Sequence, residues 1–239
     1  GNTTQGSFSP YGSLWSNYFG GSSNYLSIPD SAAFTLGTNN FCVETWINPT
    51  SVSSGTSQSI IGQWSSSSYG WIFQYRSGTL LMYYSTDGSS TTNAISAATT
   101  ISAGVWTHIA FVRNGNTLSA YVNGTRVSTN SSFTANIVNS SSTINVGRNG
   151  DNSEYVTGYL SNTRMVVGAS VYDPTQSTIT VPTTPLTAIT NTSLLTCQSN
   201  RFIDNSSNNA TITPNGTPSV QRFSPFNPTA SYDTATIGG

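Results

Sequence analysis

The first candidates for acid–base chemistry in this chain are its one histidine and its eight acids. His108 lies in the alternating run THIAFVRN, without a nucleophile or carboxylate beside it in sequence. Glu44, in FCVETWI, has no acidic neighbour, whereas glycoside hydrolysis generally needs two carboxylates that flank the scissile bond. A partner for His108 from a distant strand is an open alternative. We expect both side chains to have structural roles, and we expect that the protein is not an enzyme.

Aromatic residues flank a serine run in the segment GQWSSSSYGW (62–71), and further tyrosines and an acid follow in the next hairpin. Aromatic rings can stack on sugar rings while polar side chains bind the hydroxyls. The alternative is that these rings belong to the core, as most aromatics in a sandwich do. The candidate glycan-binding residues are Trp64, Tyr69, Trp71, Tyr84 and Asp87.

The composition excludes several classes of partner. Only 6% of the 239 residues are charged, against about 25% in ordinary soluble proteins, so the surface must be rich in Ser, Thr, Asn and Gly. The seven basic residues are scattered and form no stripe for binding phosphates, so we expect no nucleic acid partner. The sequence has no apolar run of about 18 residues and no basic amphipathic helix, so we expect no membrane insertion.

The elements that position these residues are predicted to be strands, because short β-branched and aromatic runs alternate with Gly, Asn and Ser turns. In 105–127, Asn114-Gly115 predicts a tight turn with positive φ at both residues, and Asn123-Gly124 predicts a second. Both faces of 41–47 carry large apolar groups, which predicts a central strand covered on both sides. The expected strands are 24–28, 40–48, 58–64, 70–76, 79–85, 92–96, 105–113, 117–123, 143–148, 157–167 and 193–198.

Cys42 and Cys197 leave two states open. A disulfide between them would imply an oxidising compartment. The alternative is two buried free thiols, since a buried cysteine behaves as a small hydrophobic residue.

The C-terminal part of the sequence differs from the rest. Its Pro/Thr-rich segment 174–192 cannot form regular ladders, because its prolines lack a donor, and is expected to be an extended strap. The motif SFSPYG (7–12) returns as RFSPFN (222–227). The two copies are offset by 215 residues, from 7 to 222. A repeat of this length is too long for a solenoid and fits tandem whole domains, with chance similarity as the alternative. Because the chain starts at Gly1, we expect a processed product or a slice of a longer protein.

The order of motifs resembles the laminin-G-like or concanavalin A-like lectin-glucanase jelly-roll superfamily, in the tandem-repeat type found in phage and environmental bacterial surface proteins. The residues that carry the resemblance are NYFGGSSNYLSIP (17–29), FCVETWINP (41–49), VWTHIAFVRNGNTLSAYVNGTRV (105–127), TINVGR (143–148) and GYLSNTRMVVGASVYD (158–173). The segment 184–226 resembles the joints between tandem copies. The resemblance implies an all-β fold, a two-sheet antiparallel jelly-roll sandwich, with the Pro/Thr-rich strap added.

The expected organisation has four parts. Residues 1–16 form a linker or repeat joint, 17–173 the sandwich, 174–192 the strap, and 193–239 a strand and joint. The last part either completes this chain's own sandwich or opens a next repeat, which would leave an exposed edge here. We expect self-completion, because an isolated sandwich with an open edge should aggregate.

The resemblance also implies calcium as a candidate ion, since many members hold Ca²⁺ with Asp, Asn and backbone oxygens near loop ends. Hard oxygen ligands on flexible loops suit this ion. The candidate ligands are Asp30, Asp151, Asn152 and Glu154. Asn162 stands where relatives commonly carry an acid, and solvated loop acids are the alternative. We expect no cofactor to be required.

These expectations add up to a non-catalytic structural or adhesion module, displayed outside the cell on a virion, as a fibre or decoration protein, or on a bacterial surface. Its expected partners are a glycan or cell-surface polysaccharide, bound weakly, and other copies or virion proteins. A dedicated glycan-binding lectin is one alternative. The other is an assembly unit that pairs with neighbouring copies through its C-terminal strand.

Overall fold

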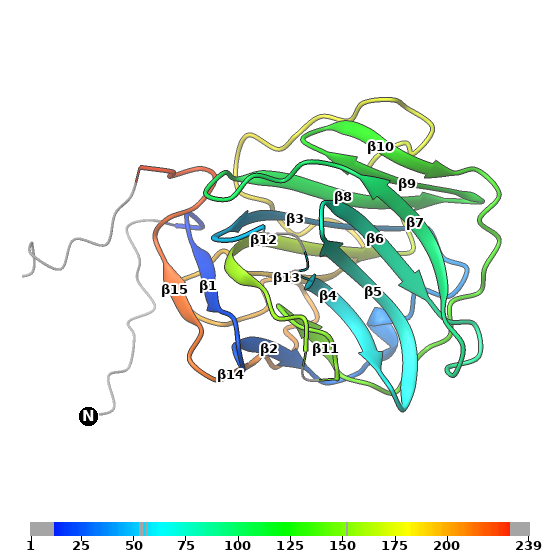
Figure 1. The fold of residues 1–239 in the computed structure, drawn as a ribbon, viewed down its shortest axis with the longest axis horizontal. Coiled ribbons are helices and arrows are strands. Elements are labelled where there is room, and N and C mark those ends of the chain that lie inside the picture. The colour runs from blue at the N-terminus through cyan, green and yellow to red at the C-terminus, as the bar shows by residue number, and fades with distance from the viewer. Residues whose placement is uncertain (1–11, 53–54, 56, 152, 230–239) are drawn as a thin grey trace, which may run out of the picture.

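The computed structural model describes residues 12–229 except 53, 54, 56 and 152. These residues form a sandwich of two antiparallel sheets, and the one helical element among them is the 3-10 turn η1 (Ala32–Phe34). The expected all-β, two-sheet fold is therefore confirmed (Figure 1).

The first sheet, sheet A, has eight strands. In spatial order they are β10 (Thr125–Asn130), β9 (Thr117–Val122), β8 (Thr107–Asn114), β3 (Phe41–Pro49), β12 (Thr157–Val167), β1 (Ser16–Gly20) and β15 (Ser219–Gln221), with β13 (Thr192–Thr196) also paired to β12. β3 pairs with β8 on one side and with β12 on the other. The strand that carries FCVETWI is thus central, as its two apolar faces predict.

The second sheet, sheet B, has seven strands. In spatial order they are β14 (Thr213–Asn215), β2 (Tyr25–Ile28), β11 (Ile144–Val146), β4 (Ser57–Ser65), β5 (Ser68–Arg76), β6 (Thr79–Tyr84) and β7 (Thr92–Ala98). Late strands therefore lie at one edge of each sheet: β14 pairs with β2 in sheet B, and β15 pairs with β1 in sheet A (Figure 1).

The core lies between the sheets and is filled by inward-facing residues of both. Phe73 on β5 stacks on Phe111 on β8, with ring centroids 4.1 Å apart. Trp71 and Leu118 are fully buried in the same cluster. Such an aromatic pair adds about 0.5–1.5 kcal/mol beyond the burial of its area, so the Phe73–Phe111 contact helps to hold the two sheets face to face.

A second apolar cluster covers the outer face of sheet A. Cys42, Val112 and Tyr121 on the sheet belong to this cluster, and Val171 and Ile179 from the following segment pack against it. The segment also bonds to the sheet, since the Tyr121 hydroxyl donates to the Gln176 carbonyl at 2.9 Å. Residues 168–189 therefore cover the outer face of the central strands, which explains why β3 is apolar on both sides. This observed cover, which starts before the segment 174–192 expected from the sequence, is called the strap below.

The two Asn-Gly pairs behave differently. Asn123 and Gly124 have φ of 47° and 79° and connect β9 to β10, as predicted. Asn114, in contrast, pairs with Thr117 in the ladder, and of these turn residues only Gly115 has positive φ. The β8–β9 turn therefore lies one residue later than the Asn-Gly pair predicts.

Glu44 is a buried carboxylate on the outer face of β3, 1% exposed. Arg164 Nε donates to its Oε1 at 3.0 Å, and the Tyr172 hydroxyl donates to its Oε2 at 2.9 Å. His108 Nε2 lies 3.1 Å from the same Oε2. The partner of His108 thus comes from the neighbouring strand β3, and the four side chains form a network that links β3, β8, β12 and the strap.

The network keeps Glu44 ionised. Burial by itself would raise the pKa of this carboxyl, but the hydrogen bond with His108 and the charge of Arg164 outweigh burial and hold the pKa below its ordinary value. With both of its oxygens bound and no exposed surface, the carboxylate has no access to a substrate, so Glu44 and His108 belong to the scaffold.

We expect Glu44→Gln to lower the free energy of unfolding by about 3–5 kcal/mol, because it leaves the Arg164 guanidinium buried without its anion. Urea unfolding at neutral pH measures this loss. Asp173→Asn is the control, since Asp173 is exposed and accepts hydrogen bonds within its own turn; it should cost less than about 1.5 kcal/mol. Equal losses in the two variants would contradict the assignment.

The same variant has a predicted pH dependence. Since the pKa of Glu44 is lowered in the folded state, its stabilisation is complete above the unfolded carboxyl pKa of about 4.3 and is lost as the pH falls below it. The stability difference between wild type and Glu44→Gln should therefore shrink in acid.

Both cysteines are free and buried. Cys42 lies in the cluster under the strap, whereas Cys197 lies in the core between the sheets. Burial raises the pKa of both thiols, that of Cys197 to about 12. Neither thiol is therefore placed to react.

We expect a thiol-specific reagent to leave the native protein unmodified and to label both of its two cysteines once urea unfolds it, because only the thiolate is nucleophilic. Absorbance of the released chromophore measures the labelling. Loss of both thiols from the unfolded, unreduced protein would reveal a disulfide and contradict the structure.

Candidate ligand-binding site

Three half-buried aromatic rings gather at one end of sheet B. Trp64 on β4 lies 4.7 Å from the Tyr69 ring on β5 and 6.5 Å from the Tyr83 ring on β6, measured between centroids. A β-bulge between Gln63 and Trp64 breaks the register here and leaves Gly70 as the extra residue. Bulges re-aim side chains, and this one places Trp64 opposite Tyr69.

A shallow pocket of about 320 Å³ opens beside Trp64. Apart from the Trp64 ring and Gly150, every residue that lines it carries a hydroxyl or an amide: Ser65, Ser67, Ser68, Ser141, Ser142, Thr143 and Asn145. Ser65 and Ser142 share a hydrogen bond of 2.9 Å, and Ser142 also donates to the Ser68 carbonyl. The turn between β4 and β5 is thus tied to the segment that precedes β11, and among the described residues that line the pocket there is no carboxylate.

Gly150, from a third segment of the chain, also lines the pocket, and its neighbour Asp151 ties that segment to the β4–β5 turn. The backbone N–H of Ser66 donates to Asp151 at 2.6 Å. Gly150 passes so close to β4 that a Cβ there would lie 1.6 Å from the Trp64 carbonyl oxygen, so this position requires glycine. The structure therefore brings together the serine-rich aromatic loop and the Asp151 loop, which lie far apart in the sequence.

Asp30 supports the pocket from behind. It accepts a hydrogen bond of 2.7 Å from the Gln63 amide, which also donates to the Ser140 carbonyl. The Ser140 hydroxyl in turn donates to the Ser68 carbonyl at 2.8 Å. Asp30 thus holds the pocket wall in place.

Three other predicted glycan-binding residues lie elsewhere. Trp71 is fully buried in the core, 5.3 Å from Phe73, so its ring has no face free for a ligand. Tyr84 packs against Phe133 and the core. Asp87 is exposed, and the backbone N–H groups of the residues that follow, Ser90 and then Ser89, lower its pKa by donating hydrogen bonds.

The sequence reasoning chose Tyr84 and left out its neighbour Tyr83. Successive residues of a strand face opposite sides of the sheet. Tyr84 pairs with buried Trp71, whereas Tyr83 pairs with Ile72 on the other face. Strand alternation from a known core residue on β6 would have selected Tyr83, but the sequence alone did not show which face of this strand meets the core.

The proposed calcium ligands do not converge. Glu154 forms an ion pair with Arg76 and also accepts hydrogen bonds from Ser59 at 3.0 Å and from Asn149 at 3.2 Å. Asp30 and Asp151 are bound to Gln63 and Ser66 as above, and Asn152 lies outside the described residues. Within residues 12–229, gaps aside, no three His, Cys, Asp or Glu side chains gather to hold a metal ion. The three described candidates, Asp30, Asp151 and Glu154, therefore do not form a common calcium site.

Comparison with known proteins agrees with this architecture. The model of the family described as the concanavalin A-like lectin/glucanases superfamily (Laminin_G_3) matches residues 19–169. The chain belongs to this family. No match was found among curated proteins.

Solved structures share the fold at low sequence identity. A heptameric SAP-like pentraxin from Limulus polyphemus is 17% identical, with a TM-score of 0.57 over 89% of this chain and 96% of that one. A putative carbohydrate-binding protein from Bacteroides ovatus is 14% identical, with a TM-score of 0.60 over 87% of this chain and 59% of that one. The binding domain of Paraclostridial Mosquitocidal Protein 1 is 15% identical, with a TM-score of 0.50 over 61% and 38% of the two chains. These likenesses establish the jelly-roll fold.

Among the described residues, no helix has the length and hydropathy needed to cross a membrane.

A bound calcium ion would stabilise the folded state by mass action. Because the described candidate ligands do not converge, we expect the melting temperature to differ by less than about 1 °C between about 5 mM calcium and excess EDTA. Differential scanning fluorimetry measures both conditions. A rise of several degrees with calcium that Asp151→Asn abolishes would show that a site exists at this loop.

Proposed function

We propose that this protein is a non-catalytic binding module that adheres to glycans through the Trp64 surface, defined as Trp64, Tyr69 and Tyr83 with the adjoining hydroxyl-lined pocket. The observation that carries this proposal is the convergence of three separate segments on one half-buried ring, that of Trp64. Within this site a half-buried indole lies directly beside a depression rich in hydroxyl and amide groups.

The chemistry of the surface favours a neutral sugar. Sugars present apolar ring faces together with hydroxyls that both donate and accept, and the site offers aromatic rings next to serine, threonine and asparagine side chains. None of the lining residues that the structure describes is charged, so this lining favours neither an anionic nor a cationic ligand. A shallow, open site buries little of its ligand, which makes weak, multivalent adhesion the expected mode of binding.

The described lining of the pocket lacks the two carboxylates that glycoside hydrolysis generally requires, which argues against that reaction here. Glu44 is committed to its buried network. The comparisons support a binding role: the family description includes lectins, and the Bacteroides ovatus neighbour is described as a putative carbohydrate-binding protein.

We place the module on the outside of a virion, as a fibre or decoration protein, or on a bacterial surface, in a tandem array. A surface with only 6% charged residues suits such a location, because it limits nonspecific attraction to charged polymers. The near-repeat of SFSPYG as RFSPFN supports the tandem arrangement.

A glycan array followed by calorimetry on the best ligand tests the site. Trp64→Ala should weaken binding by about tenfold or more, the cost of removing an aromatic anchor, whereas Trp64→Phe should retain part of the affinity. Tyr18→Ala is the matched control, because Tyr18 is a half-buried aromatic residue on β1 of the other sheet. A flat array, or equal losses in Trp64→Ala and Tyr18→Ala, would contradict the proposal.

A further inference from the structure

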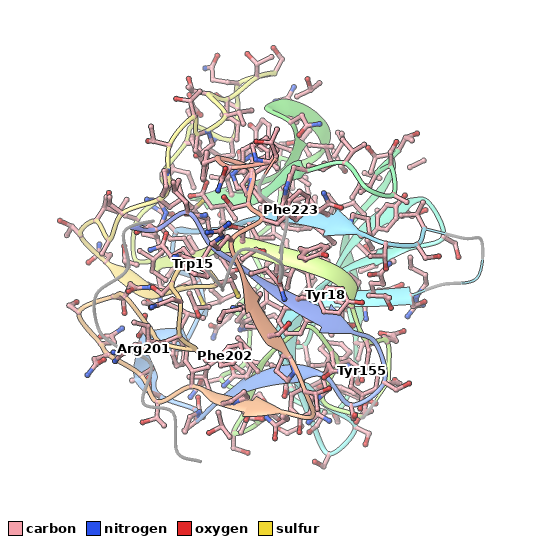
Figure 2. All side chains as sticks on the ribbon, turned by 90° about the vertical axis from the view of Figure 1, so that its left-hand side faces the viewer. Trp15, Tyr18, Tyr155, Arg201, Phe202 and Phe223 are labelled. Atoms are coloured by element: carbon pink, nitrogen blue, oxygen red, sulfur yellow. The ribbon has the colours of Figure 1, made fainter. Side chains whose placement is uncertain are left out.

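The outer face of sheet A carries an aromatic platform next to the strap, formed by Trp46, Trp106 and Tyr159. Phe223 packs on two of its rings, 5.2 Å from Trp106 and 4.9 Å from Tyr159. Phe226 packs edge-on against Trp46 at 5.8 Å. Figure 2, seen from the end of the sandwich where β1 and β15 lie, shows Phe223 close to these two strands. The platform is thus covered by a segment from the end of the chain.

That segment, RFSPFN (222–227), is called the plug below. It forms a compact turn, because Asn227 N–H donates to the Ser224 carbonyl at 3.0 Å. Ser224 is fully buried, and the Ser16 hydroxyl donates to the Phe223 carbonyl at 2.5 Å. The turn presents both phenylalanine rings to the platform, with Ser-Pro between them.

The sequence holds a second copy of the plug. In SFSPYG (7–12), Phe8, Ser9 and Pro10 repeat the Phe-Ser-Pro of the plug, and Tyr11 stands where the plug has Phe226. Residues 7–11 lie outside the described residues, so their relation to the plug rests on sequence.

The one aromatic change suits the platform. The indole N–H of Trp46 is buried and lacks an acceptor within the described part of the chain. A tyrosine in place of Phe226 brings a hydroxyl, which can accept a hydrogen bond, to the ring that packs against Trp46.

We propose that, in a tandem array, residues 7–12 dock as a plug on the aromatic platform of the sandwich that precedes them, in the position that residues 222–227 occupy on this one. This interaction is independent of the proposed glycan binding. Only the four residues GSLW separate Tyr11 from β1, and five residue steps span at most about 18 Å. Each plug therefore covers one sandwich and leads directly into the first strand of the next, which holds neighbouring units at a short, fixed spacing.

A sequence exchange within the full chain tests whether the head motif can act as a plug. The variant Arg222→Ser/Phe226→Tyr/Asn227→Gly converts RFSPFN into SFSPYG. Its melting temperature, corrected for that of Arg222→Ser alone, should stay within about 2 °C of wild type, whereas Phe223→Ala/Phe226→Ala should lower it by about 5 °C or more. A loss in the exchange variant above half of that in the alanine variant overturns the proposal, and so does an alanine variant that melts like wild type.

Direct docking is tested with the peptide QGSFSPYGS, residues 5–13. The receptor is the full chain carrying Phe8→Ala, Tyr11→Ala, Phe223→Ala and Phe226→Ala, so that neither of its own motifs competes; circular dichroism confirms that it folds. The peptide should change tryptophan fluorescence saturably, and a peptide with both aromatic residues replaced by alanine should not. Absence of binding, or equal binding of the two peptides, overturns the proposal. If the receptor does not fold, the exchange variant decides.

Discussion

The ionised carboxylate of Glu44 in the middle of sheet A sets the main constraint on this structure. A buried charge is tolerated only when its partners satisfy it, and here the partners come from β8, β12 and the strap. Arg164 extends the network by donating to the Thr187 carbonyl at 3.0 Å, which anchors the far end of the strap. The network therefore fixes the register of the three central strands and also holds the cover on their outer face.

Much of the fold could be predicted from the sequence because the signals are local. Alternating apolar residues identified most strands, and two apolar faces identified β3 as central. The four strands that were not predicted, β1, β10, β14 and β15, are short and mostly polar, and they are strands because they pair with neighbours already in place. The His108–Glu44 contact was equally out of reach, since it depends on a register that sets Trp46 opposite His108.

The candidate site shows a different limit. The sequence singled out both the Trp64 loop and the Asp151 loop, but nothing in it showed that they touch. Asp151 and Glu154 are three residues apart, yet Asp151 binds the Trp64 loop while Glu154, with φ of 53°, turns to Arg76. One bulge at Gln63 decides which rings are presented and which are buried. Proximity in sequence was therefore a poor guide to shared chemistry, and a backbone irregularity was decisive.

The family match ends at residue 169, but the physical unit does not. Beyond that point the chain supplies most of the strap over Glu44, three further strands, and the plug over Trp46 and Trp106. Without these additions the outer face of sheet A would expose apolar and aromatic surface, together with the buried ion network. A jelly roll of this kind is therefore complete only when its C-terminal extension returns across it.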